Sequence, residues 1–257
     1  MRAGRVSKTE SRIRSVANIL EQIATLPDAW PLAGSLRMAG LERIAALAAG
    51  REIRSSAETG TGKSTLLLSH LSARHTVFTM DDSGAGDSLT VVRGSPLLRR
   101  EVVEFVVGPT QRTLPRHAFA QPLDLAMIDG PHGFPFAQLE YFFLYPQLAP
   151  GALLVVDDIH IRAVNDLFCV LRADAMFELV DVVRTTAFFR RSDAPTLDPF
   201  GDGWWLQRYN LKLLPLPAGL PLLEKLKCLI PWPLKERLRA LRKSYVPAAE
   251  RPGRGTR

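Results

Sequence analysis

The sequence predicts an α/β fold: a mostly parallel sheet with helices on both faces and an antiparallel strand at one edge. Three observations lead to this fold class. Short apolar runs alternate with helical patterns through the middle of the chain, and strands that are covered on both faces need such continuous runs. A glycine loop, Gly60-Thr-Gly62, stands directly before one of the helical patterns. The last two apolar runs are joined too tightly for a crossover helix, which indicates an antiparallel pair.

Two helices are expected before the sheet. Apolar residues recur at helical spacing in residues 9–26 and again in residues 35–49, and this spacing is typical of amphipathic helices. Packing against the sheet is the favoured role for both helices. Shaping the entrance for a substrate is the alternative.

The sheet pattern begins at Ile53, shortly before the glycine loop. Arg54, Ser55 and Ser56 make its first strand unusually polar, whereas the central strands that follow are apolar. Several of those strands end at Gly, Pro or Asp, which commonly bound strands. In chain order we expect strands over residues 53–59, 75–80, 102–107, 123–128, 152–156, 177–183 and 185–190, and helices over 63–73, 136–145 and 161–172.

The chain is predicted to have three parts. Residues 1–50 form a helical extension, residues 51–191 the domain with the sheet, and residues 192–257 a loop or lid with a basic amphipathic tail. The loop contains the pair Trp204-Trp205. Such a pair is typical of a packed loop, and a lid that closes over a site is the alternative.

The net charge of +7 is concentrated in the tail. Residues 212–257 contain 11 Lys and Arg but only 3 Asp and Glu, whereas residues 1–211 contain 22 and 23. Because the body is neutral, we expect no nucleic-acid partner. The tail either covers the body or contacts a membrane surface or an acidic partner.

A cytoplasmic protein is the simplest interpretation of the remaining composition. The two cysteines, Cys169 and Cys228, lie in no CxxC or metal-ligand pattern, which suits a reducing compartment. No apolar run reaches the roughly 20 residues that cross a bilayer. The basic first 14 residues lack the apolar core of a secretory signal.

Acidic residues follow three of the predicted strands. Asp81 and Asp82 follow the second strand, Asp129 the fourth, and Asp157 and Asp158 the fifth. In an open α/β sheet, ligands bind outside the carboxyl ends of the strands. We therefore expect these acids to share one edge of the sheet with the glycine loop.

These motifs, in this order, resemble the class I S-adenosylmethionine (SAM)-dependent methyltransferases over roughly residues 53–190. The resemblance depends on Glu58-Thr-Gly-Thr-Gly-Lys-Ser-Thr65, Asp81, Ile128-Asp-Gly-Pro-His132 and the segment 148–159. The last two are similar to a branch with metal-dependent O-methyltransferases of sugars and natural products, related to the catechol type. The resemblance implies a Rossmann-like sheet, SAM as methyl donor and a hydroxyl of a small molecule or sugar as acceptor.

The resemblance also assigns the residues that hold the donor. Glycines in the loop would let the backbone approach the amino-acid end of SAM, whose ammonium group the first acid of the motif would help to hold. The acid after the second strand would accept hydrogen bonds from the ribose hydroxyls. The implied donor-binding residues are Glu58, Gly60, Gly62, Ser64, Asp81 or alternatively Asp82, Gln111 at the adenine edge, and Asp129.

A metal and a base complete the implied site. Asp129, Asp157 and Asp158 would be hard oxygen ligands for Mg²⁺, which would orient the acceptor hydroxyl and lower its pKa. His132 or His160 would accept the proton, with Asp129 also counted among the catalytic residues. The alternative for the three aspartates is helix N-capping without a metal.

The glycine loop also admits a second interpretation, a P-loop of a nucleoside triphosphatase or kinase. Residues 57–64 satisfy a relaxed P-loop pattern in which Ala57 replaces the first glycine. The polar first strand argues against it, and it leaves Asp81 and Asp129 without a role. The chain departs from the methyltransferase pattern as well, with two loop glycines instead of three, a polar first strand and Ala152 in place of a second glycine.

Overall fold

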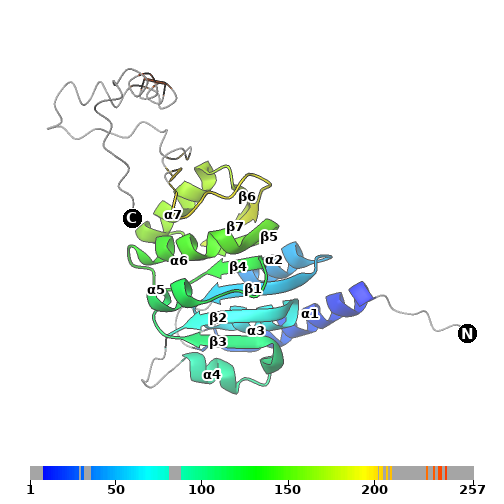
Figure 1. Cartoon of the computed structure of the whole chain (residues 1–257). Coiled ribbons are helices and arrows are strands. Elements are labelled where there is room, and N and C mark those ends of the chain that lie inside the picture. Colours follow the sequence, from blue (N-terminus) through cyan, green and yellow to red (C-terminus); the bar gives the residue numbers. More distant parts are fainter. Residues whose placement is uncertain are drawn as a thin grey trace, which may run out of the picture. The chain divides into compact units, whose positions relative to one another are not determined.

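A computed structural model of the chain (Figure 1) describes most of the first 201 residues. The contacts divide the chain into two units, Met1–Phe200 and Gly201–Arg257, and the whole sheet belongs to the first. No helix among the described residues is long and apolar enough to cross a membrane. The described residues are 8–28 (backbone only for 8–14), 30–31, 36–80 and 88–201, and beyond these 203, 204, 207, 209, 230, 234, 237, 238 and 241.

Seven strands form one sheet in the order β3-β2-β1-β4-β5-β7-β6. The first five strands are mutually parallel, and β7 runs antiparallel between β5 and the edge strand β6. The predicted fold class is therefore confirmed. The strands are β1 (Ile53–Thr59), β2 (Ser72–Thr79), β3 (Val103–Val107), β4 (Leu123–Ile128), β5 (Leu148–Val156), β6 (Phe177–Val183) and β7 (Thr186–Arg191).

Helices cover both faces of the sheet (Figure 1). One core joins Ile23, Leu41 and Leu67 to the sheet residues Met127 and Phe188, so the helices α1 to α4 lie on one face. The helices α6 and α7 cover the other face, with α5 beside α6. The helices are α1 (Lys8–Ala24), α2 (Met38–Ala48), α3 (Lys63–Leu71), α4 (Ser88–Gly94), α5 (Thr110–Thr113), α6 (Phe136–Leu144) and α7 (Arg162–Ala173), with short 3-10 turns at Arg100–Val102, Leu114–Arg116 and Tyr145–Gln147.

The polar first strand is explained by a buried hydrogen-bond network. The Ser56 hydroxyl lies 2.6 Å from the Ser72 hydroxyl and 2.8 Å from His75 Nδ1. The other ring nitrogen of His75 lies 3.1 Å from Glu58 Oε1, which also accepts a hydrogen bond from Thr65. All five side chains are buried. Because buried polar groups are tolerated when they are paired, a polar strand can occupy the middle of this sheet.

The largest difference from the predicted boundaries is at β5. It begins at Leu148 and not at Ala152, because Leu148 pairs with Leu123 across a register shift in β4. Gly151, at φ +79°, lies within this irregular part of the strand. In a sequence, a proline followed by a glycine usually indicates the boundary of a strand. Here Pro150 and Gly151 lie inside an irregular strand.

Candidate functional site

The glycine loop packs directly against the end of β4. Gly60 has φ +92°, and a Cβ added to it would lie 2.3 Å from the backbone oxygen of Asp129. Only glycine fits this position without displacing the backbone. The next residue, Thr61, has a buried hydroxyl without a hydrogen-bond partner among the described residues. The loop therefore lies on the same edge of the sheet as Asp129.

Glu58 lies beneath this loop and not on its surface. Its side chain is 1% exposed, and Oε1 accepts the hydroxyl of Thr65. The same Thr65 hydroxyl oxygen accepts the backbone N–H of Gly62 at 3.1 Å. Glu58 thus fixes the end of the loop where α3 begins. Ser64, in the first turn of α3, is also buried.

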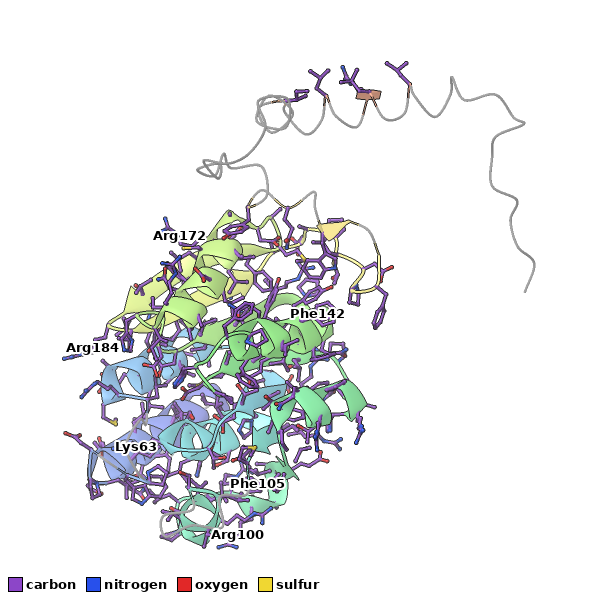
Figure 2. The ribbon with its side chains drawn as sticks, turned by 90° about the vertical axis from the view of Figure 1, so that its left-hand side faces the viewer. Lys63, Arg100, Phe105, Phe142, Arg172 and Arg184 are labelled. Carbon is purple, nitrogen blue, oxygen red and sulfur yellow. The ribbon has the colours of Figure 1, made fainter. Side chains whose placement is uncertain are left out.

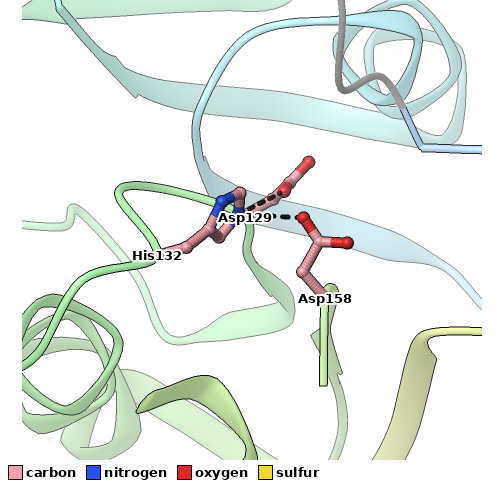
Figure 3. A group of neighbouring side chains, drawn as sticks. All are labelled: Asp129, His132 and Asp158. Carbon is pink, nitrogen blue, oxygen red and sulfur yellow. Dashed lines mark ion pairs between the residues drawn. The ribbon is translucent and has the colours of Figure 1, made fainter. Parts of the chain in front are cut away.

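Three side chains converge after β4 and β5. One ligand atom each of Asp129, His132 and Asp158 lies within 4.8 Å of the other two, and Figure 3 shows the imidazole facing the two carboxylates. The ring atom Nε2 of His132 lies 3.2 Å from Asp158 Oδ2 and 3.5 Å from Asp129 Oδ1. This group is called the acid–histidine cluster below.

The two consecutive aspartates after β5 have different surroundings. Asp157 Oδ1 accepts the Thr186 hydroxyl at 2.7 Å and the backbone N–H of Asp158 at 2.8 Å. Asp158 has φ +55°, a left-handed conformation that aspartate tolerates better than most residues. Asp157 therefore holds the turn, and Asp158 joins the acid–histidine cluster.

The two candidate histidines differ in position. His132, at 36% exposure, lies inside the cluster, whereas His160 is 60% exposed and its Nδ1 lies 3.5 Å from Asp158 Oδ1. A proton acceptor needs to reach the reacting hydroxyl in a site that excludes water. The geometry therefore favours His132 over His160 for that role.

Burial and mutual repulsion perturb the ionisation of the cluster. Burial raises the pKa of Asp129 to about 8, the neighbouring His132 opposes this shift, and the charges of Asp157 and Asp158 add to it. The contact with Asp129 raises the pKa of His132, although burial opposes the rise. Burial also raises the pKa of Asp157. Carboxylates held this close together favour a proton or another cation between them.

Glu140 supports the turn that carries Asp129, and the sequence alone did not reveal it. It comes from α6, is 1% exposed, and accepts the Thr59 hydroxyl at 2.7 Å. The oxygen of that hydroxyl accepts the backbone N–H of Asp129 at 3.1 Å. The carboxyl of Glu140 fills the space beside Gly130, where a Cβ would lie 2.1 Å from Oε1. A lone acid in the aromatic helix Phe136–Leu144 was the signal that could have identified it.

The other predicted donor contacts are only partly described. Gln111 is exposed on α5, just past the end of β3. Asp81, Asp82 and Trp205 lie outside the described residues, as does most of the tail.

A cavity of about 540 Å³ adjoins the cluster. Its lining includes Asp157 and Asp158, the start of α3 at Lys63, and the turn between β6 and β7. The start of α2 forms another part of its wall. The cavity is large enough for a small organic molecule.

The central part of the chain matches a known family. Residues 57–159 match the model of a family described as a methyltransferase domain. The match covers less than half of the chain, from β1 to the turn after β5. It agrees with the predicted class I SAM-dependent methyltransferases, and the comparisons do not support the P-loop alternative. Ala57 lies inside β1 with no exposure, whereas the first residue of a P-loop begins the loop.

Solved structures support the same fold. A putative O-methyltransferase from Klebsiella pneumoniae is 16% identical, with a TM-score of 0.52 over 70% of this chain and 90% of that one. A putative caffeoyl-CoA O-methyltransferase from Staphylococcus aureus is 13% identical, with a TM-score of 0.53 over 72% and 93%. The SAH-bound methyltransferase PaMTH1 from Podospora anserina is 16% identical, with a TM-score of 0.50 over 75% and 99%. No curated protein matches the chain.

Proposed function

We propose that this methyltransferase moves the methyl group of SAM to a hydroxyl oxygen of a small molecule or sugar. The observation that carries the proposal is the contact between Gly60 and the backbone of Asp129. It joins the loop suited to the donor to the acid–histidine cluster on one edge of the sheet. Two structures with the same fold are named as putative O-methyltransferases, which supports oxygen as the acceptor atom.

The donor is proposed to lie across the glycine loop. Gly60 and Gly62 let its amino-acid end approach the backbone, and the Thr61 hydroxyl is a further polar group near it. Glu58 acts through Thr65 on the shape of the loop, and direct contact with the donor ammonium stays a prediction. Contacts of Ser64, Asp81 or Asp82, Gln111 and Asp129 with the donor stay predictions as well.

The reaction itself needs positioning and a proton acceptor. The sulfonium of SAM is an activated donor, so in-line alignment of the hydroxyl oxygen with the methyl carbon supplies most of the catalysis. As the new C–O bond forms and the C–S bond breaks, His132 takes the hydroxyl proton and SAH leaves. Asp129 and Asp158 stabilise the imidazolium that results, because both carboxylates lie beside its ring.

The cluster also fits a divalent cation. Asp129 and Asp158 offer hard oxygen ligands of the kind that Mg²⁺ prefers, and their ligand atoms lie within 4.8 Å of one another. Asp157 was predicted as a third ligand, but its Oδ1 is already bonded to Thr186. When bound, Mg²⁺ would lower the pKa of the acceptor hydroxyl. His132 would then remain the proton acceptor.

The setting of the reaction is inferred from the sequence. A cytoplasmic location agrees with two cysteines outside any disulfide or metal pattern. A contact of the 212–257 tail with a membrane surface or an acidic partner stays a prediction.

Titration calorimetry with the full chain tests the proposal. We expect SAH and SAM to bind with micromolar affinity and ATP not to bind. Release of SAH from SAM in the presence of a panel of phenols, sugars and sugar acids would then identify the acceptor class. Binding of ATP without binding of SAH would overturn the proposal.

A further inference from the structure

The cavity beside the acid–histidine cluster contains a buried lysine without an acidic partner. Lys63 is 4% exposed, and buried lysines are rare unless they are paired. Among the described residues no carboxylate lies within 4.0 Å of its ammonium group. Its hydrogen bond to the Leu26 carbonyl is 3.4 Å long and therefore weak.

The position of Lys63 in its helix makes this charge still more costly. It is the first residue of α3, a helix of nine residues. The helix dipole places partial positive charge at that end, so a cation there is destabilised and an anion is favoured. The buried ammonium group of Lys63 and the N-terminus of α3 together create a region of positive electrostatic potential. No described side chain forms an ion pair with Lys63.

Two further cations line the same cavity. Arg37 precedes α2, and Arg184 lies in the turn between β6 and β7. Both are exposed and neither forms an ion pair with another described residue. Figure 2 shows Lys63 and Arg184 toward the same side of the molecule. Asp28, Asp157 and Asp158 also line the cavity, so its lining holds three acids beside the three cations. The cations come from three separate elements, and none of the three is ion-paired with a described acid.

The lining of the cavity indicates which reactant it receives. It includes Asp157 and Asp158 but none of the glycine-loop residues Gly60, Thr61 and Gly62. The donor is proposed to lie on that loop, so the cavity belongs to the side of the acceptor. Its volume of about 540 Å³ suits a sugar or an aromatic ring with a substituent.

We propose that this cavity is the acceptor pocket and that the acceptor carries an acidic group, a carboxylate or a phosphate. Lys63 binds that group, Arg37 and Arg184 close over it, and the hydroxyl to be methylated points to Asp158 and His132. The inference rests on the proposed methyl transfer. It adds the substrate class: an acidic hydroxy compound.

The experiment measures the effect of inorganic phosphate on thermal unfolding of the full chain with saturating SAH. Sodium chloride at equal ionic strength is the reference. Phosphate that binds the native state raises the unfolding temperature with its concentration. We expect Lys63→Met to weaken the apparent affinity for phosphate at least about tenfold, the loss expected for a buried charged hydrogen bond. Lys63→Arg should keep most of the affinity.

Two further variants separate binding from folding. Arg184→Asn tests the pocket without touching the core, since asparagine tolerates the left-handed turn at φ +55°, and we expect a loss of phosphate affinity of at most about fivefold. Arg100→Met removes an exposed cation that does not line the cavity and should leave the phosphate affinity unchanged.

Each contrary result has its own meaning. Equal phosphate affinity in the natural protein and Lys63→Met would refute an anion site. A tenfold loss of SAH affinity in Lys63→Met would assign the lysine to the donor carboxylate and refute the acidic acceptor. Phosphate binding that depends on Lys63 in a protein that does not bind SAH would preserve the anion site and refute methyl transfer instead.

Discussion

The molecule contains two groups of polar side chains at neighbouring strands, and they are built in opposite ways. The network between β1 and β2 is closed to solvent: Ser56, His75 and Glu58 are buried and bonded to one another, and Glu58 Oε2 has no hydrogen-bond partner among the described residues. The acid–histidine cluster after β4 and β5 is open, because Asp158 and His132 are partly exposed. A buried and paired network serves the fold, whereas an exposed and unbalanced one is suited to a ligand.

The two groups are nevertheless connected through the glycine loop. The closed network ends at Thr65, which holds the Gly62 N–H, and the open cluster includes Asp129, whose backbone contacts Gly60. The buried network therefore holds one end of the glycine loop in place, and the other end of the loop packs against the acid–histidine cluster. Changes in the open cluster should therefore reduce turnover, and changes below the loop should reduce stability first.

Removal of metal is expected to have the largest effect. EDTA should lower turnover at least about a hundredfold, and added Mg²⁺ should restore it, since the metal would orient and acidify the acceptor hydroxyl. The measurement is SAH formation, with SAH affinity as the control that should not change. Full activity in EDTA would return Asp129 and Asp158 to structural roles.

Replacement of the histidine inside the cluster should come next. His132→Gln removes the proposed proton acceptor and should lower kcat by roughly a hundredfold with unchanged SAH affinity. His160→Gln is the matched control, since His160 contacts the same Asp158 from the exposed side. A larger loss for His160→Gln would exchange the two roles.

The glycine loop offers an unusually clean test of close contact. Gly60→Ala combines a positive φ with a clash at 2.3 Å, whereas Gly50→Ala has φ +74° and nothing within 4 Å of the added Cβ. Both should lose about 1–2 kcal/mol to backbone strain. Only Gly60→Ala should also weaken SAH binding, by at least about tenfold in calorimetry. Equal SAH affinities in the two variants would show that the donor does not depend on this loop.

Local patterns were sufficient to predict most of the sheet. The predicted strands 123–128 and 177–183 coincide with β4 and β6, because apolar runs and bounding turn residues are local signals. The short helices α4 and α5 were missed, since seven and four residues are too few for a helical period. The resemblance to the methyltransferases followed from the order of the motifs along the chain, and the family model matches the same region.

The site was less predictable, because its roles depend on which side chains meet in space. Asp157 and Asp158 are neighbours in sequence, yet they have different roles. Asp157 holds the turn because it accepts the hydroxyl of Thr186, whereas Asp158 faces the site. Likewise Glu140 meets Thr59 across 81 positions of sequence. No periodicity or motif carries such information.

The last prediction concerns the pH dependence of stability that Glu140 causes, and its expected effect on turnover is the smallest. Burial raises the pKa of its carboxyl from 4.5 to about 7, so the native state binds a proton that the unfolded chain releases between these values. The contribution of Glu140 to stability is therefore greatest below pH 4.5 and falls as the pH rises through 7, by at most about 3 kcal/mol.

Urea unfolding at pH 5 and pH 8 measures this dependence. Glu140→Gln keeps the bond to Thr59 but cannot ionise, so its loss of stability between the two pH values should be smaller than that of the natural protein. Comparison of the two proteins cancels the similar dependence from Asp129, whose pKa is also raised. Glu140→Ala should lose about 2–4 kcal/mol at pH 5, because it empties the space beside Gly130 and leaves the Thr59 hydroxyl without its acceptor. The loss should be smaller at pH 8, where the natural protein has itself lost part of the contribution of Glu140. Identical pH dependence in the natural protein and Glu140→Gln would mean that this carboxyl is ionised at both pH values. The turn that carries Asp129 would then be supported by a charged carboxylate and not by a protonated carboxyl.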